Sequence, residues 1–401
     1  RKTGHMNTPF GRALLPLFAL NASYTNLNQG SYGAPPHAVL DAGSAIRARV
    51  EANPDRFFRM DLFSLLPPVI ARLARMVGAS PEDVVLIDNA SHGVNAVLRS
   101  LHIPIGKKIL TLNVAYCMVK NTVKYLSNEW HAQSLEVSVQ LPEMGDDEIV
   151  AAVEQALVAN TGGVHVASFS HIVSLPSVIL PVERLVALCH KHGVLVLIDG
   201  AHALGQIPLA LDALDADFYV ANGHKWLNTA KGSALLWARR NVQRLIEPTT
   251  ISWEGQGASH FQAAFSYEGT ADYSAVLSMG AALDFRQRLG GEDAVMHYMH
   301  SLAVQGGELA AAAWGTSLLF ADHSRFGAMV DVRLPAHNAS IDWTDELLNG
   351  LAGGRSTYVP IYGDGHGGEI ARISCAVYND LDDIRFFATT VKRIIAKHAV
   401  K

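Results

Sequence analysis

Cysteine is scarce in this chain, and its scarcity argues against two kinds of architecture. The three cysteines, Cys117, Cys189 and Cys375, lie far apart in the sequence and form no CxxC pair. Such spacing fits neither a disulfide framework nor a structural zinc site. We therefore expect a reducing compartment and no metal.

Long apolar runs and runs of positive charge are missing as well. The longest apolar stretches, such as 193–198 and 309–314, are far shorter than the roughly 20 residues that span a bilayer. The chain has 32 basic and 37 acidic residues, and no more than two basic residues are adjacent. We expect a cytoplasmic protein that binds small molecules, with neither nucleic acid nor a membrane as a partner.

Short apolar, β-branched runs are abundant between Val84 and Arg239, where they alternate with stretches of helical length. This alternation is typical of a parallel sheet that is covered by helices. The predicted strands are 84–88, 108–113, 135–139, 164–168, 194–199, 217–221 and 233–238. The predicted helices are 91–101, 116–127, 146–159 and 181–192.

The composition changes after Pro248, which indicates a domain boundary. A polar segment over 255–272 precedes long helical patterns that begin at Ser274. Candidate strands over 327–334, 357–361 and 369–375 and a final helix over 381–397 indicate a smaller α+β unit. We predict an N-terminal segment over 1–35 that lines the active site, a large domain over 36–255 and a small domain over 256–401.

The most informative stretch contains Asp199 and Lys225. An apolar strand ends at Asp199, where ligands bind in open α/β sheets, and Lys225 follows the next strand. Pyridoxal phosphate (PLP) chemistry needs both groups: the lysine amine forms a Schiff base with the cofactor, and the carboxylate keeps the pyridine nitrogen protonated. Ala201 is small enough to lie under the ring, and His202 can contact its substituents. Either charge alone would be read as a turn cap or a surface residue, but together with Trp226 they predict a PLP site.

The sequence resembles the fold-type-I PLP enzymes of the class V aminotransferase family. Within that family it resembles the branch of isopenicillin N epimerases, cysteine desulfhydrases and ergothioneine-pathway C–S lyases. The resemblance is carried by the Asp199 and Lys225 pair and by the motifs at 24–33, 88–93, 170–174, 269–272 and 372–379. It implies an α/β fold with a mainly parallel sheet in the large domain and a smaller C-terminal α+β domain.

A phosphate site is expected where a helix opens directly after a strand. Ala90, Ser91 and His92 stand there, so that free N–H groups and the positive helix end would meet the cofactor phosphate, although Ser91 alone could be an ordinary N-cap. The resemblance adds Asn222 and His224, but the family often has a hydroxyl residue at the first of these positions.

The resemblance also implies a homodimer. Thr270, in the pair Gly269-Thr270, would reach the cofactor of the partner subunit, and a plain loop residue is the alternative. It further places Tyr116 on the ring face opposite Ala201 and Ser174 near the phenolic oxygen of PLP.

Arg372 lies in a strand pattern that would bury it, and a buried arginine needs an anion. By the resemblance this anion is the α-carboxylate of an amino-acid substrate, and an internal ion pair is the alternative. Asn28 and Tyr32 would line the same pocket. The roles of three more residues stay open: Cys117 as an acid or as packing, and Arg56 and Arg355 as contacts to a second anionic group or as surface ion pairs.

Fold-type-I enzymes share a carbanion whose fate depends on pocket geometry, so the family does not fix the reaction. We predict β-elimination from a cysteine-derived amino acid, because the segment 26–33 resembles the desulfhydrases and ergothioneine lyases most. The alternatives are an epimerase or racemase, a C–C bond-forming enzyme, an aminotransferase, and a cofactor-free binding protein. A persulfide-forming desulfurase is disfavoured because Cys375, the only cysteine between Lys231 and Ala376, lies in a predicted strand.

Overall fold

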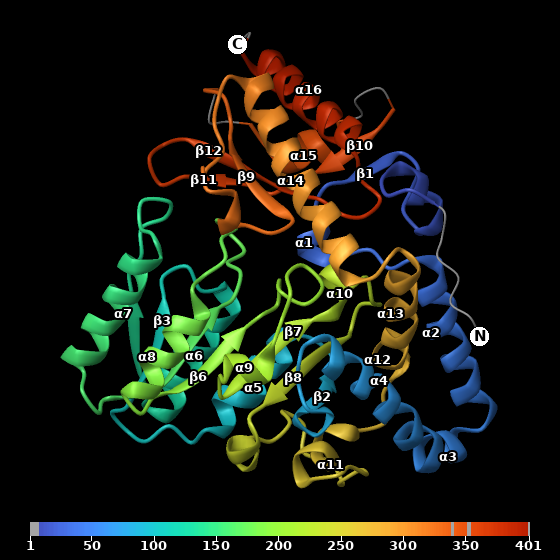
Figure 1. Ribbon diagram of the computed structural model, residues 1–401, viewed down its shortest axis with the longest axis vertical. Coiled ribbons are helices and arrows are strands. Elements are labelled where there is room, and N and C mark those ends of the chain that lie inside the picture. Colours follow the sequence, from blue (N-terminus) through green and yellow to red (C-terminus); the bar gives the residue numbers. More distant parts are fainter. Residues whose placement is uncertain (1–7, 338–340, 351–353, 400–401) are drawn as a thin grey trace. The chain divides into compact units, whose positions relative to one another are not determined.

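The computed structural model describes residues 8–337, 341–350 and 354–399, and these divide into two compact units (Figure 1). The larger unit comprises residues 38–173 and 180–283, and the smaller comprises the N-terminal residues to His37, the segment 174–179 and the residues from Asp284 onward. By their contacts, residues 256–283 therefore group with the larger unit, whereas the sequence placed a boundary after Gly255.

The larger unit is built on a seven-stranded sheet with the order β2-β8-β7-β6-β5-β3-β4. Strands β3 to β7 are parallel, and β8 runs antiparallel to both β7 and β2. The strands are β2 (Val84–Ile87), β3 (Lys108–Leu112), β4 (Gln133–Val137), β5 (Val164–Ser170), β6 (Leu195–Asp199), β7 (Phe218–Asn222) and β8 (Ala234–Ala238). The predicted, mainly parallel α/β sheet is confirmed.

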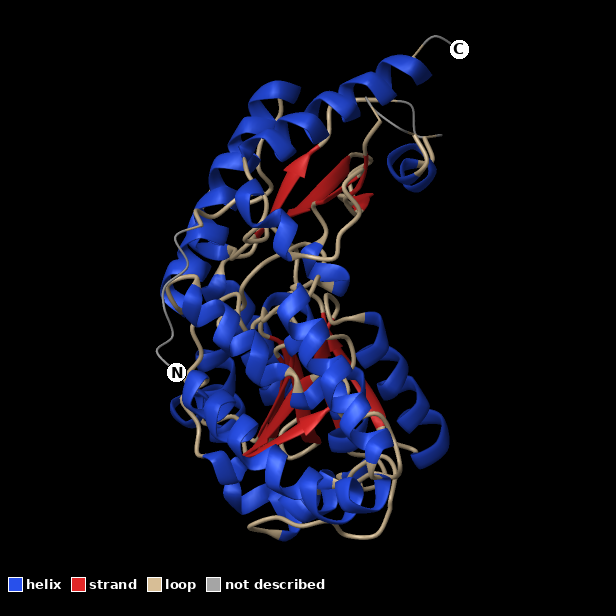
Figure 2. Cartoon of the chain, turned by 90° about the vertical axis from the view of Figure 1, so that its right-hand side faces the viewer, coloured by secondary structure: helices blue, strands red, loops and turns tan. Residues whose placement is uncertain are grey.

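Helices flank this sheet, as Figure 2 shows. Every residue of β2, β7 and β8 is buried, which explains why their sequences are apolar runs, interrupted only by Asn222 at the end of β7, rather than alternating ones. The helices of the unit are α2 (His37–Ala52), α3 (Pro54–Arg56), α4 (Leu62–Met76), α5 (Ala90–Ser100), α6 (Cys117–Trp130), α7 (Asp146–Ala159), α8 (Val182–Lys191), α9 (Leu211–Leu214), α10 (Gly223–Trp226), α11 (His260–Ser266), α12 (Ser274–Leu277) and α13 (Met279–Arg288), which continues into the smaller unit. Short 3-10 and π turns also occur at η1 (Arg12–Leu17), η2 (Phe57–Asp61), η3 (Pro81–Asp83), η4 (Arg240–Leu245) and η5 (His323–Arg325).

Helix α5 lies unusually close to β7, and a glycine permits this approach. A Cβ atom on Gly93 would come within 2.5 Å of the Val220 side chain and 2.7 Å of Ile87. Val94, Val97 and Leu98 of α5 are buried in the core beside the sheet. The first turn of α5 is thereby held at the carboxyl end of β7.

The smaller unit has a three-stranded antiparallel sheet of order β11-β12-β9, against which α14 packs together with α16. The predicted strand over 357–361 is in fact two strands, separated at Pro360, which has no N–H for a ladder hydrogen bond. The first of the two, β10, pairs in parallel with β1 near the N-terminus. The elements are α1 (Gln29–Tyr32), α14 (Glu292–Trp314), α15 (Trp343–Leu348), α16 (Leu381–His398), β1 (Tyr24–Asn26), β9 (Met329–Arg333), β10 (Ser356–Tyr358), β11 (Ile361–Gly363) and β12 (Glu369–Ser374).

The helices within the described ranges include none that is long and apolar enough to cross a membrane.

Candidate active site

Asp199 and Lys225 follow neighbouring parallel strands, so the fold brings them to the same edge of the sheet. Asp199 is the last residue of β6 and is only 4% exposed, and Lys225 lies in α10, directly after β7. Burial raises the pKa of Asp199, although the N–H of Ala201, 3.0 Å from Oδ1, and the charge of a protonated Lys225 oppose the rise. A buried carboxylate of this kind is stabilised by a cation such as a protonated pyridine nitrogen. The residues present therefore fit PLP.

His202, three residues after Asp199, contacts Lys225. Its Nε2 lies 3.1 Å from Lys225 Nζ, and its Nδ1 lies 3.4 Å from the indole nitrogen of Trp226. His202 is buried, and its backbone carbonyl accepts a hydrogen bond of 2.6 Å from Gln206 Nε2. The Trp226 contact was not predicted from the sequence, although this residue adjoins the lysine.

Two backbone N–H groups at the N-terminus of α5 donate hydrogen bonds to side chains of this same chain. The N–H of Ala90 donates to Asn222 Oδ1 at 2.9 Å, and the N–H of His92 donates to the side chain of the N-cap Asn89 at 2.9 Å. Ser91 lies between them in the same first turn. Asn222 is thus adjacent to the predicted phosphate residues, but its side-chain oxygen is bound to Ala90.

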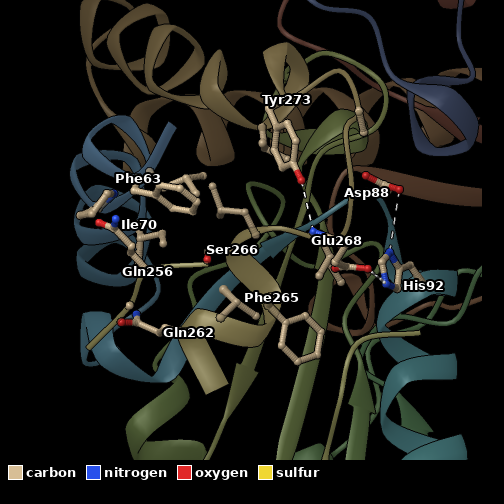
Figure 3. A pocket seen from close by; sticks show the side chains of 18 of the residues that line it. Phe63, Ile70, Asp88, His92, Gln256, Gln262, Phe265, Ser266, Glu268 and Tyr273 are labelled. Atoms are coloured by element: carbon tan, nitrogen blue, oxygen red, sulfur yellow. Dashed lines mark hydrogen bonds and ion pairs between the residues drawn. The ribbon is translucent and has the colours of Figure 1, made fainter. Parts of the chain in front are cut away.

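His92 carries a positive charge at neutral pH. Burial lowers its pKa, but interactions with Asp88 and Glu268 outweigh burial and raise the pKa to about 9. Figure 3 shows the ring between the two carboxylates, with Nε2 3.0 Å from Glu268 and Nδ1 3.8 Å from Asp88. Glu268 is the closer and less exposed partner, with a side chain that is 18% exposed against 73% for Asp88, and its contact with Nε2 is an ion pair without hydrogen-bond geometry.

These three residues stand at one end of a pocket of about 630 Å³ in the larger unit. Phe63, Ile70, Phe265 and Tyr273 contribute apolar and aromatic walls (Figure 3). The Tyr273 hydroxyl donates to the carbonyl of Gly269 at 2.9 Å and accepts from the N–H of Glu268 at 3.2 Å. The loop that carries Glu268 is therefore held by its own hydrogen bonds.

Thr270 is exposed on the same loop, with its hydroxyl 2.8 Å from that of Tyr267. His224, beside the lysine, is neutral, because burial and the charges of Lys225 and Lys231 lower its pKa to about 4. Tyr116 is the N-cap residue of α6 and is 50% exposed, and Cys117 after it is exposed.

Arg372 lies on β12 of the smaller unit and is 2% exposed. One terminal nitrogen donates to the Ser174 hydroxyl at 2.8 Å and carbonyl at 3.1 Å, and the other donates to Asn28 at 2.9 Å and Ser31 at 3.0 Å. Ser174 therefore lies in the smaller unit and contacts the arginine. Tyr32, also predicted for this pocket, is 71% exposed.

A carboxylate also stands beside this arginine. Asp331 is the register partner of Arg372 on β9, and burial raises its pKa to about 6 while the Ser177 N–H and Arg372 lower it. Ser31, within the motif at 24–33, and Glu268, directly before Gly269-Thr270, were not predicted as site residues. The available signals were the place of Ser31 inside one recognised motif and that of Glu268 next to another.

The residues with open roles have internal contacts. Arg56 forms an ion pair with Asp61 at 3.4 Å. Arg355 lies 3.0 Å from Asp383 and stacks over the ring of Phe386. These contacts agree with the alternative in which both arginines form ion pairs within the chain.

Cys375 follows β12 and is fully buried, and burial raises the pKa of its thiol. The neutral thiol is a poor nucleophile, because the thiolate is the reactive form. This environment agrees with the expectation that the chain does not carry a persulfide on Cys375.

A mostly parallel sheet with a buried aspartate at one strand end and a lysine after the next strand defines a PLP-dependent enzyme of fold type I. The chain belongs to the class-V aminotransferase family, whose model matches residues 34–387. PLP is accordingly its cofactor.

Three relatives align over nearly the full length. The L-cysteine desulfhydrase-like protein lolT1 of Epichloe uncinata is 30% identical over 96% of this chain and 96% of its own. The hercynylcysteine sulfoxide lyase of Schizosaccharomyces pombe is 26% identical over 96% and 98%, and the isopenicillin N epimerase of Amycolatopsis lactamdurans is 30% identical over 94% and 96%. A solved structure of a cystine C–S lyase with its product cysteine persulfide has the same fold, with a TM-score of 0.79 at 21% identity over 92% of this chain and 97% of that one.

Proposed function

We propose that this enzyme is a C–S lyase that acts on a cysteine-derived amino acid by β-elimination. The observation that carries the proposal is the full-length similarity to proteins named as a cysteine desulfhydrase-like protein and a sulfoxide lyase, in a chain that retains Asp199 and Lys225. Epimerisation is the second candidate, because an isopenicillin N epimerase aligns over 94% of the chain.

The cofactor, when bound, withdraws electrons from the substrate Cα and so makes its proton acidic. In our proposal Lys225 anchors the cofactor covalently and then moves the Cα proton. Asp199 stays ionised and holds the pyridine nitrogen protonated, and this ion pair offsets the burial that otherwise raises the pKa of Asp199. Tyr116 would contact the cofactor ring on the side opposite Ala201. Ala90, Ser91, His92, Asn222 and His224 would bind the phosphate, for which the N–H groups of Ala90 and His92 would exchange their present acceptors, Asn222 and Asn89.

Arg372 binds the substrate α-carboxylate in this proposal. Its two terminal nitrogens already donate to Ser174, Asn28 and Ser31, so the substrate carboxylate would take the place of some of these acceptors, which hold the guanidinium in position. Elimination then breaks the Cα–H and Cβ–S bonds. A thioether releases a thiol and a sulfoxide releases a sulfenic acid, and the remaining carbon skeleton takes up water to give pyruvate and ammonia.

The proposal includes a homodimer in which Thr270 binds the phosphate of the partner's cofactor. The support is that Thr270 is exposed on a loop whose neighbouring residues are fixed by hydrogen bonds. An ordered loop can present a hydroxyl to another subunit without a further loss of conformational entropy.

The test incubates the enzyme with S-alkyl cysteine or its sulfoxide in deuterated water. Keto-acid release and incorporation of deuterium at Cα are followed together, with the Lys225→Ala variant as the blank. Stoichiometric release of pyruvate and ammonia supports the lyase. Exchange with inversion and no pyruvate would replace it with the epimerase, and neither signal would direct the search to C–C bond formation or transamination.

A further inference from the structure

Asp331 and Arg372 place opposite charges side by side in the interior of the smaller unit. Asp331 on β9 is the register partner of Arg372 on β12, so the two side chains are cross-strand neighbours on one face of the sheet. Each residue is only 2% exposed. Burial makes an ionised carboxylate costly, and the charge of Arg372 offsets part of that cost. Asp331 therefore provides an anion near Arg372 before any substrate is bound.

The two oxygens of Asp331 differ in their hydrogen bonding. Oδ2 accepts a hydrogen bond from the backbone N–H of Ser177, whereas Oδ1 has no hydrogen-bond partner within the described part of the chain. The hydroxyl of Tyr362 on β11 interacts with this carboxylate, although without regular hydrogen-bond geometry. A protonated Asp331 can donate to the Tyr362 oxygen. The surroundings of Asp331 thus accept the neutral acid as well as the anion.

In the proposed function, substrate binding brings a second carboxylate to Arg372. Two buried anions close to one cation repel each other, and this repulsion favours the binding of a proton by one of them. An α-carboxyl group ordinarily titrates at about 3.5, whereas burial has already raised the pKa of Asp331 to about 6. The proton is therefore expected on Asp331, and the substrate carboxylate stays ionised.

We propose that Asp331 is a positioning residue, which balances the charge of Arg372 in the empty site and takes up one proton from solution when the substrate α-carboxylate binds. The inference rests on the proposed function, in which Arg372 binds that carboxylate. The proton compensates for the negative charge that the substrate brings, so the net charge around the arginine stays the same. Substrate binding is then coupled to pH through a residue that does not touch the reacting atoms.

The charged and titratable groups around Asp331 do not replace it in this role. Arg333 lies two residues along β9 on the same face and forms an ion pair of 2.9 Å with Asp364, whose pKa is lowered by backbone N–H groups of its own loop. Burial and the charge of Asp331 raise the pKa of Tyr362, so its hydroxyl stays neutral. The segment 174–179 has no titratable side chain.

The first test measures proton uptake when the holoenzyme binds methylthiopropanoate. This probe has the carboxylate and the thioether of the proposed substrate but no amino group, so it does not react. Calorimetric titrations in buffers of different ionisation enthalpy give the number of protons taken up. We expect nearly one proton per subunit at about pH 7.5 and much less at about pH 5, where Asp331 is already protonated. Absence of uptake at the higher pH overturns the proposal.

The affinity for the probe should change with pH in the same way. A group whose pKa rises on binding leaves the affinity constant below its free pKa and weakens binding above it. The dissociation constant of the wild type should therefore rise by up to about tenfold per pH unit above pH 6. A dissociation constant that is flat between pH 6 and 8 contradicts the proposal.

Asp331→Asn removes the titrating group and keeps an acceptor for the N–H of Ser177. We expect this variant to take up no proton and to bind the probe roughly tenfold more tightly than the wild type at about pH 7.5, with similar affinities at about pH 5. Asp364→Asn, which removes the carboxylate that is paired with Arg333, is the matched control and should keep the wild-type uptake. Uptake that persists in Asp331→Asn overturns the proposal, as does weaker binding at both pH values, which would indicate a structural role.

Infrared difference spectra of the wild type test the protonation if Asp331→Asn does not fold. Binding of the probe should convert a carboxylate band into the C=O band of a protonated carboxyl group, and a spectrum without this band rejects the proposal.

The outcomes are distinguishable from those of the proposed function. Arg372→Gln should abolish binding of the probe, because the cation that holds its carboxylate is removed. Binding that depends on Arg372 without proton uptake in the wild type would overturn the role of Asp331 alone. Proton uptake that depends on Asp331 in an enzyme without C–S cleavage would support the role of Asp331 and reject the lyase.

Discussion

At the scale of single residues, the proposed chemistry depends first on one amine. Replacing Lys225 with Ala should abolish turnover, by about a thousandfold or more, because the covalent anchor and the proton carrier are lost together. The fold should persist, since the residue is only partly buried. Circular dichroism and keto-acid release measure the two effects.

The assignment of Lys225 as the covalent anchor of the cofactor can be tested chemically. Borohydride reduction of the wild-type holoenzyme followed by peptide mapping should find the pyridoxyl group on Lys225. A label on Lys231 or Lys191 instead would contradict the assignment.

A second residue-scale prediction concerns the charge of Asp199. Asp199→Asn should lower the rate by about a hundredfold or more while cofactor binding weakens less, because an amide cannot hold the pyridine nitrogen protonated. Burial also makes the carboxylate costly without a cation, so the cofactor-free variant should unfold at a temperature equal to or above that of the wild type. Steady-state kinetics and thermal melts test this, and a rate within a few-fold of wild type would remove Asp199 as the ring partner.

At the scale of elements, the loop around Glu268 is linked to the start of α5 by an ion pair that depends on pH. The pKa of His92 is raised to about 9 from an ordinary value of 6.5. A raised pKa means that the folded state binds the proton more tightly, so this stabilisation is complete below pH 6.5 and is lost as the pH rises through 9.

Glu268→Gln should therefore lower the free energy of unfolding by about 1–2 kcal/mol at pH 6 and by little above pH 9.5. The value is below the full shift because Asp88 remains and water screens the partly exposed pair. Denaturant titrations of the cofactor-free protein at the two pH values measure it. Asp272→Asn, which breaks an exposed ion pair with Arg47, is the control and should show no such pH dependence.

A further prediction at this scale compares Gly93, which lies in α5 against β7, with Gly43, which lies in α2 with open space around it. Gly93→Ala should destabilise the protein by about 1–3 kcal/mol and weaken PLP binding, because the added methyl group meets Val220 at 2.5 Å and pushes the helix from β7. Gly43→Ala in α2, where no atom lies within 4 Å, should instead stabilise by about 0.5–1 kcal/mol. Equal effects of the two changes would contradict the packing argument.

At the scale of the whole molecule, the homodimer can be tested by complementation. Thr270→Asp should weaken binding of the partner's cofactor through repulsion between the carboxylate and the phosphate, whereas Thr270→Ser should retain most activity. A mixed dimer of Thr270→Asp and Lys225→Ala subunits contains one site with a native lysine and a native Thr270. Coexpression should therefore recover roughly a quarter of the wild-type activity if subunits pair at random.

If the coexpressed subunits show no more activity than the sum of the two variants measured alone, Thr270 either binds the cofactor of its own subunit or binds no cofactor. Sedimentation of each variant establishes whether the dimer itself survives, so that a loss of assembly is distinguished from a loss of phosphate binding.

The large sheet was predictable because its signal is local. Strands that are buried on both faces must be largely apolar runs, and the helices α5, α7 and α8 between them begin after Asn89, Gly145 and Pro181. The aspartate at the end of one run and the lysine after the next could be read in the same way, since parallel strands end at the same edge.

Pairing between distant segments was not predictable from such signals. Nothing in the run at 234–238 indicates that β8 reverses direction and lies between β2 and β7. Likewise, nothing near Ser174 in the sequence indicates that it contacts Arg372, on a strand almost two hundred residues away. Such contacts depend on the packing of whole elements and leave no short-range period in the sequence.

The sequence by itself thus determined the family, the cofactor and the order of strands and helices along the larger unit, because each of these is encoded in neighbouring residues. The tertiary structure alone decided which groups meet: His92 with Glu268, Arg372 with Asn28, and His202 with Trp226. The physical reason is that charge and pKa are set by distances between side chains, and only the folded chain fixes those distances.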